Sequence, residues 1–558
     1  TVLFVHQLLT GLEYPVYDGL DKDQQEAWTI FGCYPGFAWM PPTIAAGPGS
    51  RSVVIWAGGK LKQINFNTAY LGNQAQYPEW FSIKEIPFRC QVKTKVAETL
   101  LFENKVFEKE FTARAIRQAV TSPDGSTLVF NAAGKLYKKA LPDGAPELLI
   151  REKYGRSHFT QVVIDDPEML EFEPCFSADG KEVIFVSWND LNGGGLWKVN
   201  LQQGKPEQLP VRGGIFRTPQ LSSDGTKLVF RLQNGDDELG VSNVEKTGVF
   251  YLDFAEQDGS TWNMIHFVTD QGEYPRFSPD GKRILVSTGG YLFGALDKKL
   301  VSFDLNGQDR RELFKSKYAN QWEPSPDGKW LALTELHKAY VCAMPAPGQT
   351  IDLSAETKAI PVSQIARDAG YNLHWSGDSK KVHYTLGDEY FTLRLDQRFT
   401  FLPGAPDSLP ELPENGRKIG LVLPADVPDG SIVFTNARII TMEDDQVIEN
   451  GVLVVRNNKI AFVGTTSDYR RNFKLQTPNF KQINCKGKTI MPGIVDVHAH
   501  SGNFRFGLNP QKQWEYYANL AFGVTTMHDP SVSSEMAFSN AEMLRSGRMN
   551  GPRLFITG

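Results

Sequence analysis

The chain has 558 residues, of which 41% are hydrophobic and 22% charged, with a formal net charge of −5. This length predicts two or three domains, and the composition is typical of a soluble globular protein. The slightly acidic charge gives no electrostatic reason to expect a nucleic-acid partner, and no apolar run is long enough for a membrane-spanning helix.

Two further features concern the whole chain. Thr1 opens a stretch that already has the pattern of a strand, so we expect a preceding segment, and a signal peptide cannot be judged. The five cysteines stand singly, without framework or CxxC spacing, and are expected to be isolated buried thiols: Cys33, Cys90, Cys175, Cys342 and Cys485.

A turn signature recurs along the first 400 residues. Clear Ser-Pro-Asp-Gly or Ser-Ala-Asp-Gly copies begin at Ser122, Ser177, Ser278 and Ser325, and degraded copies begin at Ser222 and Ser376. Each copy precedes a β-rich run, and Asp-Gly favours a tight turn in which glycine takes a positive φ, so each unit is predicted to be a hairpin. Spacings of roughly 45 to 56 residues are typical of four-stranded propeller blades.

We therefore predict a β-propeller over residues 1–400. A hairpin at Ser52–Asn65 lacks the turn signature but is expected to form a further blade. The resulting count is seven, and six or eight blades are compatible with the sequence. His374 and His383, beside the last hairpin, are expected to be structural.

The remaining residues are divided into three parts. Residues 401–428 carry six prolines and are predicted to be a linker. Residues 429–490 alternate as strands and are predicted to form a small β-sandwich. From residue 491 the pattern changes to strand, helix, strand, helix, strand, with helices over 511–522 and 535–545, which predicts the first strands of a (β/α)8 barrel over 491–558.

The segment MPGIVDVHAH, Met491–His500, holds the candidate site. If it is a strand, alternation places Asp496, His498 and His500 on one face and small apolar residues on the other. Two imidazoles two positions apart can bind one divalent metal ion, and nitrogen donors suit zinc. We predict His498 and His500 as metal ligands and Asp496 as a supporting hydrogen-bond partner.

Two residues near the second strand are weaker candidates. His528 is placed just past the predicted strand Val524–Met527, near the barrel mouth, where it could contact substrate or have no role. For Asp529 a turn or helix-capping role is favoured.

The PGIVDVHAH core and the preceding β-rich stretch GSIVFTNARIITMEDDQVIENGVLVVRNNKIAFVG resemble the metal-dependent amidohydrolase superfamily, particularly its imidazolonepropionase-like and prolidase-like members. The repeats resemble TolB-like and tricorn-like propellers. The resemblance implies one or two divalent ions, further metal ligands on strands beyond the third, and hydrolysis of C–N bonds in amides or peptide-like substrates by a metal-activated water.

The same resemblance implies that the chain is a fragment, since a complete barrel needs about 250 residues. Alternatively, a second chain supplies the remaining strands. Taken alone, the chain is expected to be inactive, its catalytic residues lying elsewhere. An oligomer is compatible with the sequence, and export to the periplasm is favoured over the cytoplasm. The propeller is expected to restrict access or select substrate; the alternative is a propeller-based binding or scaffold protein with a degenerate barrel.

Overall fold

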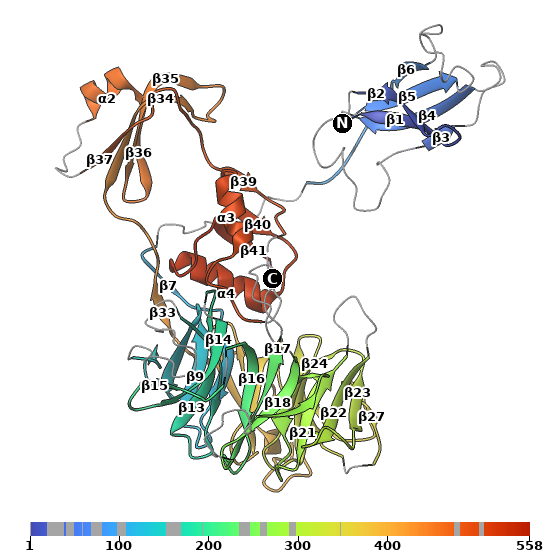
Figure 1. The fold of residues 1–558 in the computed structure, drawn as a ribbon, viewed down its shortest axis with the longest axis vertical. Coiled ribbons are helices and arrows are strands. Elements are labelled where there is room, and N and C mark those ends of the chain that lie inside the picture. The colour runs from blue at the N-terminus through green and yellow to red at the C-terminus, as the bar shows by residue number, and fades with distance from the viewer. Residues whose placement is uncertain are drawn as a thin grey trace. The chain divides into compact units, whose positions relative to one another are not determined.

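The structure is a computed structural model that describes residues 2–18, 38–40, 50–57, 60–67, 81–96, 108–151, 169–191, 193–211, 213–233, 246–256, 265–289, 297–345, 348–473, 480–500 and 507–557. It divides into two compact units, Thr1–Asn104 and Lys105–Gly558. Within the described residues it is mostly β-structure, with a few short helices (Figure 1).

The first unit contains a hairpin and a four-stranded antiparallel sheet. The hairpin is β1 (Leu3–Gln7) and β2 (Leu12–Tyr17), and the sheet is β3 (Ala38–Met40), β4 (Ser50–Ala57), β5 (Lys60–Asn67) and β6 (Phe81–Ile86). The predicted hairpin at Ser52–Asn65 therefore forms, as β4 and β5. It belongs to this unit and not to the unit that holds the six signature turns, so the assignment of residues 1–400 to a single propeller stays a prediction.

Between Arg117 and Lys418 the described residues of the second unit form six sheets of four or five strands, which confirms the propeller prediction. The first three are β8 (Arg117–Thr121), β9 (Thr127–Ala132), β10 (Lys135–Ala140) and β11 (Glu147–Leu148); β12 (Leu170–Phe176), β13 (Glu182–Asn189), β14 (Gly193–Asn200) and β15 (Pro206–Gln208); and β16 (Ile215–Leu221), β17 (Lys227–Gln233), β18 (Gly248–Asp253) and β19 (Ile265–Thr269).

The other three sheets come next along the chain. They are β20 (Glu273–Phe277), β21 (Arg283–Thr288), β22 (Lys298–Asp304), β23 (Arg311–Ser316) and β27 (Ile351–Asp352); β24 (Ala319–Pro324), β25 (Trp330–Glu335), β26 (Lys338–Ala343) and β28 (Val362–Gln364); and β29 (Tyr371–Trp375), β30 (Lys381–Leu386), β31 (Glu389–Arg394) and β32 (Arg417–Lys418). Strand β27, which follows β26 along the chain, joins the first of these three sheets. A 3-10 turn, Leu395–Gln397, follows β31.

Each signature turn joins the first two strands of one blade by the same hydrogen bonds. In the third blade, Ser222 Oγ donates to Asp224 Oδ1 (2.6 Å) and accepts from Lys227 N (2.9 Å), while Gly225 adopts φ +70°. These bonds, with those from the Thr226 amide and hydroxyl, lower the pKa of Asp224 to about 2. Because the serine and aspartate bond to each other, the motif closes the turn wherever it occurs in the sequence.

The six sheets form a closed ring. Each contacts the next, and β29 of the last blade contacts β8 of the first. The ring is joined again outside the blades, where β7 (Glu110–Thr112) pairs with β33 (Val422–Pro424). The segment predicted as a linker thus contributes β32 to the last blade and β33 to this closure; strands of two or three residues are too short to show alternation in the sequence.

The innermost strands share a bulge whose side chains connect neighbouring blades. Gln118, Glu173, Thr218 and Asn372 occupy it with φ values of 48° to 54°. The amide of Gln118 donates to Asn372 Oδ1 (2.7 Å), that of Glu173 to Gln118 Oε1 (2.9 Å) and that of Thr218 to Glu173 Oε2 (2.5 Å). The side chains of Asn372, Gln118 and Glu173 therefore each accept from a backbone amide of the following blade at a point where the ladder is interrupted.

The predicted small sandwich is a single five-stranded sheet among the described residues. Its strands are β34 (Ser431–Ile440), β35 (Val447–Arg456), β36 (Lys459–Thr465), β37 (Lys481–Asn484) and β38 (Thr489–Ile490), with α2 (Thr466–Asn472) after β36. Two small apolar clusters, one around Val433 and one around Ile439, pack along it.

The C-terminal residues form the predicted strand–helix alternation. Strands β39 (Ile494–Asp496), β40 (Val524–Asp529) and β41 (Arg553–Ile556) pair in parallel, connected through α3 (Trp514–Ala521) and α4 (Ser534–Arg545). Gly523, with φ +84°, follows the end of α3, as expected of a residue that ends a helix. No closed barrel is present among residues 491–500 and 507–557.

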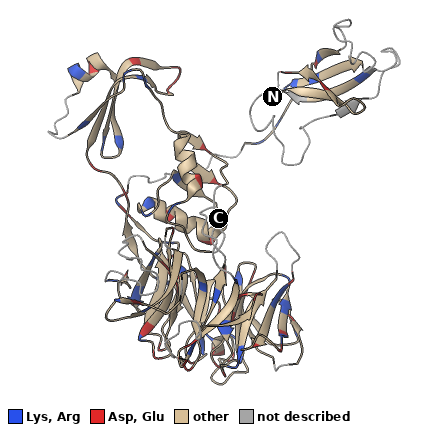
Figure 2. Cartoon of the chain, viewed as in Figure 1, with Lys and Arg blue, Asp and Glu red and all other residues tan. Residues whose placement is uncertain are grey.

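Basic and acidic residues are interspersed over the surface of the propeller in the view of Figure 2. Of the four cysteines that are described, Cys175, Cys342 and Cys485 are buried as expected, whereas Cys90 is exposed; Cys33 lies outside the described residues. None of the described helices combines the length and apolar character that crossing a membrane requires.

Candidate metal site

The two predicted ligands lie beyond the carboxyl end of β39. This strand ends at Asp496, so His498 and His500 belong to the irregular segment that follows and not to the strand itself. The prediction that one continuous strand carries all three polar residues was wrong. The alternating pattern extends to His500, but parallel strands end where pairing ends, and β40 pairs with β39 only up to Asp496.

The histidine rings are close and perpendicular. Their centroids are 5.0 Å apart with an interplanar angle of 76°, and both side chains are exposed. The Nδ1 atom of His500 lies 3.5 Å from Oδ1 of Asp529, whose side chain is 3% exposed. Asp529 also accepts a hydrogen bond from the amide of Ser531 (3.2 Å). The sequence favoured a turn or helix-capping role for this aspartate and did not show its proximity to His500.

The backbone of the histidine segment is fixed by two other predicted residues. Asp496 Oδ1 accepts a hydrogen bond from the amide of His498 (3.0 Å). His528 lies inside β40, not after it, because this strand extends to Asp529. Its Nδ1 atom is 3.1 Å from the carbonyl oxygen of Val497, and its own carbonyl accepts from the amide of Ala499 (2.9 Å).

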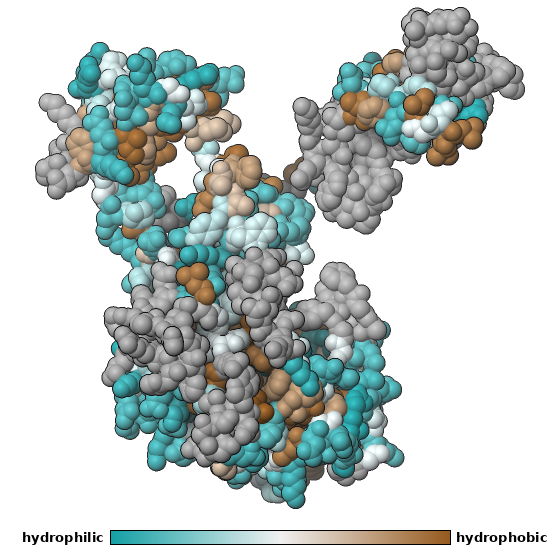
Figure 3. Space-filling model, in the orientation of Figure 1, coloured by the Kyte–Doolittle hydropathy of each residue, from teal (hydrophilic) through white to brown (hydrophobic). Residues whose placement is uncertain are grey.

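The apolar side of β39 is uncovered by the described residues. Val495 and Val497, two of the small apolar residues predicted for the face opposite the histidines, are 57% and 71% exposed. Trp514 and Phe522, on and after α3, are also exposed, so apolar side chains gather over this part of the molecule (Figure 3).

These residues match a metal ion in donor type but not in number. Two imidazoles are suitable zinc ligands, yet a catalytic zinc site takes three protein ligands. Among the described residues, no group of three or more His, Cys, Asp or Glu side chains is arranged to hold a metal ion. The described residues therefore supply only part of the ligand set that a catalytic metal ion requires.

Residues of the propeller contact the segment that follows the histidines, and sequence reasoning missed them. Arg117 of β8 and Asp190, directly after β13, bind residues Gly507–Lys512 by hydrogen bonds. Neither residue lies in a motif, and only the fold brings them to a segment more than 300 positions away.

The chain is similar in part to curated enzymes. It is 36% identical over 126 residues to imidazolonepropionase of Brucella anthropi, covering 21% of this chain and 29% of that enzyme. It is 37% identical over 73 residues to 5-methylthioadenosine/S-adenosylhomocysteine deaminase of Acetivibrio thermocellus, covering 13% of this chain and 16% of that enzyme. The chain thus spans less than a third of the length of either relative.

The similarities support the expected resemblance to the amidohydrolase superfamily on partial coverage. No family model matches the chain. Among solved structures, TolB of Acinetobacter baumannii is 13% identical, with 62% of this chain and 77% of that chain covered at a TM-score of 0.32. The propeller assignment is based on the six sheets and their closed order, not on this score.

Proposed function

We propose that the protein is a hydrolase of carbon–nitrogen bonds of the amidohydrolase type. The observation that carries the proposal is the MPGIVDVHAH segment, whose two histidines follow the first strand of a parallel strand–helix alternation in a chain similar to imidazolonepropionase and to a deaminase. In parallel β/α folds, residues at the carboxyl ends of strands form the active site. The substrate class that fits is a small molecule with an amide-like or ring C–N bond.

In this proposal His498 and His500 bind a divalent metal ion, zinc by preference, together with ligands that the described residues do not supply. Asp496 and His528 hold the backbone that carries them. The propeller contributes to substrate selection or access. Its support is the set of hydrogen bonds between propeller residues and the segment after the histidines.

The test is zinc binding by the chain together with the segment or second chain that supplies the remaining ligands, measured by calorimetry and by metal content after dialysis. We expect one equivalent of zinc that His498→Gln and His500→Gln remove. His266→Gln is the matched control, because this partly exposed histidine lies in β19 of the propeller and pairs with Glu256. Zinc binding that is absent, or that all three variants retain, would favour the binding or scaffold alternative.

A further inference from the structure

Arg117 is a buried propeller residue whose hydrogen-bond acceptors come from the C-terminal part of the chain. It lies in β8 and is 1% exposed. Its Nη1 donates to Asn509 Oδ1 (2.5 Å), its Nη2 to the carbonyl of Gly507 (2.6 Å) and its Nε to Glu535 Oε1 (3.0 Å). A buried guanidinium requires such partners, so removing them would leave an uncompensated charge inside the protein.

Asp190 holds the same segment from the second blade. Its Oδ1 accepts from the amide of Gln511 (2.9 Å) and its Oδ2 from that of Lys512 (2.7 Å). In return, the amide of Asp190 donates to Gln511 Oε1 (2.9 Å). This reciprocal pairing fixes the chain immediately before α3 begins at Trp514.

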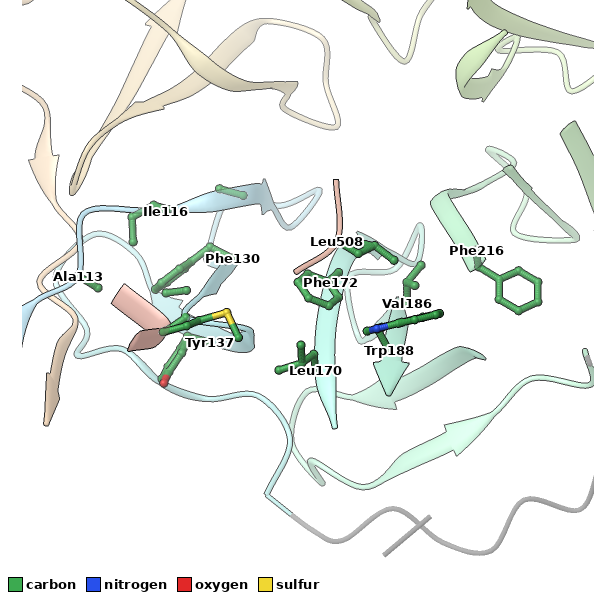
Figure 4. Packing of buried hydrophobic residues seen from close by; sticks show 14 of the residues in the cluster. Ala113, Ile116, Phe130, Tyr137, Leu170, Phe172, Val186, Trp188, Phe216 and Leu508 are labelled. Carbon is green, nitrogen blue, oxygen red and sulfur yellow. The ribbon is translucent and has the colours of Figure 1, made fainter. Parts of the chain in front are cut away.

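Apolar contacts lie between these two polar anchors. Leu508 is 9% exposed and belongs to the same apolar cluster as Phe172 and Trp188 of the second blade. Figure 4 shows its side chain beside Phe172. Ala499, which lies between the two histidines, is buried in the same cluster. The cluster therefore joins the histidine segment, the segment from Gly507 and the propeller.

We propose that Arg117 and Asp190 are positioning residues, through which the propeller determines where the chain around His498 and His500 lies. The proposal rests on the proposed function in taking these histidines as the site. The propeller thus acts as part of the site's supporting structure, in addition to any effect on substrate access. The anchored residues begin seven positions after His500 and end two before α3, so they fix the part of the connection from β39 that leads into that helix.

The experiment compares full-length Arg117→Lys and Asp190→Asn with the unmodified chain. Lysine keeps the charge but cannot reach three acceptors with one planar fork, and asparagine loses the charge that accepts two amide hydrogens. The matched control is Arg276→Lys: Arg276 also lies in an innermost strand, but its guanidinium binds Glu323 of the neighbouring blade. Hydrogen exchange by mass spectrometry is measured for peptides covering 491–500 and 507–521, and the carbethoxylation rate for His498 and His500.

We expect exchange about tenfold faster in both peptides for Arg117→Lys and Asp190→Asn, with altered modification rates of both histidines. Arg276→Lys should leave both peptides and both rates unchanged. If exchange rises only in 507–521 while the 491–500 peptide and histidine rates stay constant, the residues have a structural role only and the proposal is overturned. Should Arg117→Lys unfold the chain, Asp190→Asn decides alone.

A zinc titration of the same proteins separates this proposal from the proposed function. Failure of the unmodified chain to bind zinc counts against the metal site, while the exchange and modification results still decide the positioning role. If the unmodified chain binds zinc but exchange is unaltered in both variants, the metal site is supported and the positioning role of Arg117 and Asp190 is overturned.

Discussion

The hydroxyl of Thr121, in the first blade, lies 2.7 Å from Nε2 of His374, in the last. The Nδ1 atom of His374 is 2.8 Å from the carbonyl of Asn372, so it carries the proton and Nε2 accepts from Thr121. The Thr121 oxygen then accepts from Tyr390 (2.9 Å), and the Tyr390 oxygen from Nδ1 of His383 (2.7 Å). His374 is therefore neutral, and His383 joins it in a chain of hydrogen bonds that crosses the point where the ring closes.

Acidification should destabilise the propeller through these two histidines. Burial lowers the pKa of His374 from 6.5 to about 4, and burial together with the nearby His374 lowers that of His383 well below 6.5. The unfolded chain binds protons below about pH 6.5 that the folded chain excludes, so stability is complete above that pH and falls toward pH 4. For His374 the loss is on the order of 3 kcal/mol.

The measurement is the thermal unfolding midpoint at about pH 7.5 and about pH 5 for the unmodified chain and His374→Gln. The variant should lose less on acidification. His266→Gln, which changes a partly exposed histidine paired with Glu256, should behave as the unmodified chain does. Equal acid sensitivity of all three proteins would show that His374 is not responsible.

The signature turn predicts that alanine substitution of two adjacent serines changes the stability of the protein by different amounts. Ser222→Ala removes the hydroxyl that bonds both Asp224 and the amide of Lys227, and should destabilise the protein by about 1 to 2 kcal/mol. Ser223→Ala removes an exposed bond to the carbonyl of Pro279 and should change stability by less than about 0.5 kcal/mol. Urea denaturation compares them; similar effects would mean that the turn does not depend on its serine.

A comparison of two glycines tests how closely Gly507 approaches the propeller. Gly507 has φ +67°, and a Cβ atom there would lie 2.7 Å from Nη2 of Arg217. Gly523 has φ +84° with no atom within 4 Å of such a Cβ. Both alanine variants incur backbone strain of about 1 kcal/mol, but Gly507→Ala should also displace the segment from Arg217. Proteolysis within 507–521 should accelerate in Gly507→Ala alone, and equal acceleration in both would contradict the close approach.

The buried ion pair of Arg217 with Glu173 should be sensitive to loss of one partner. Arg217 Nη2 lies 2.6 Å from Glu173 Oε1, and both side chains are at most 10% exposed. Glu173→Gln leaves a buried positive charge and should cost about 3 to 5 kcal/mol in unfolding free energy. Asp352→Asn breaks an exposed pair with Lys315 and should cost less than about 1 kcal/mol. A small effect at Glu173 would indicate that water or another acceptor reaches Arg217.

Local sequence was sufficient for the repeated elements. Ser122 and its five counterparts predicted the hairpins because the hydrogen bonds that close each turn are made within six residues. The sixth copy has Ser379 where the others have glycine, and it still forms, with φ +58° at Ser379. The helices and strands after residue 510 were likewise predicted from their periodicity.

Contacts between distant residues were not predictable in the same way. The hairpin of β4 and β5 was predicted to be a further propeller blade, but it belongs to the first unit, which ends at Asn104. The sequence of a hairpin does not specify which sheet the hairpin joins. The end of β39 at Asp496, and hence the position of His498 and His500 outside the strand, depends on pairing with β40. No signal in the sequence associates Arg117 with Asn509.

The sequence by itself determined the turn chemistry, the strand–helix alternation and the two histidines that carry the proposed function, since each depends on neighbours within a few residues. Only the tertiary structure decided that the ring closes through Thr121 and His374, and that Arg117 and Asp190 hold the segment after the histidines. Those contacts join residues separated by more than 250 positions. Such residues become neighbours only in the complete fold, where burial makes a hydrogen-bond partner necessary for each polar group.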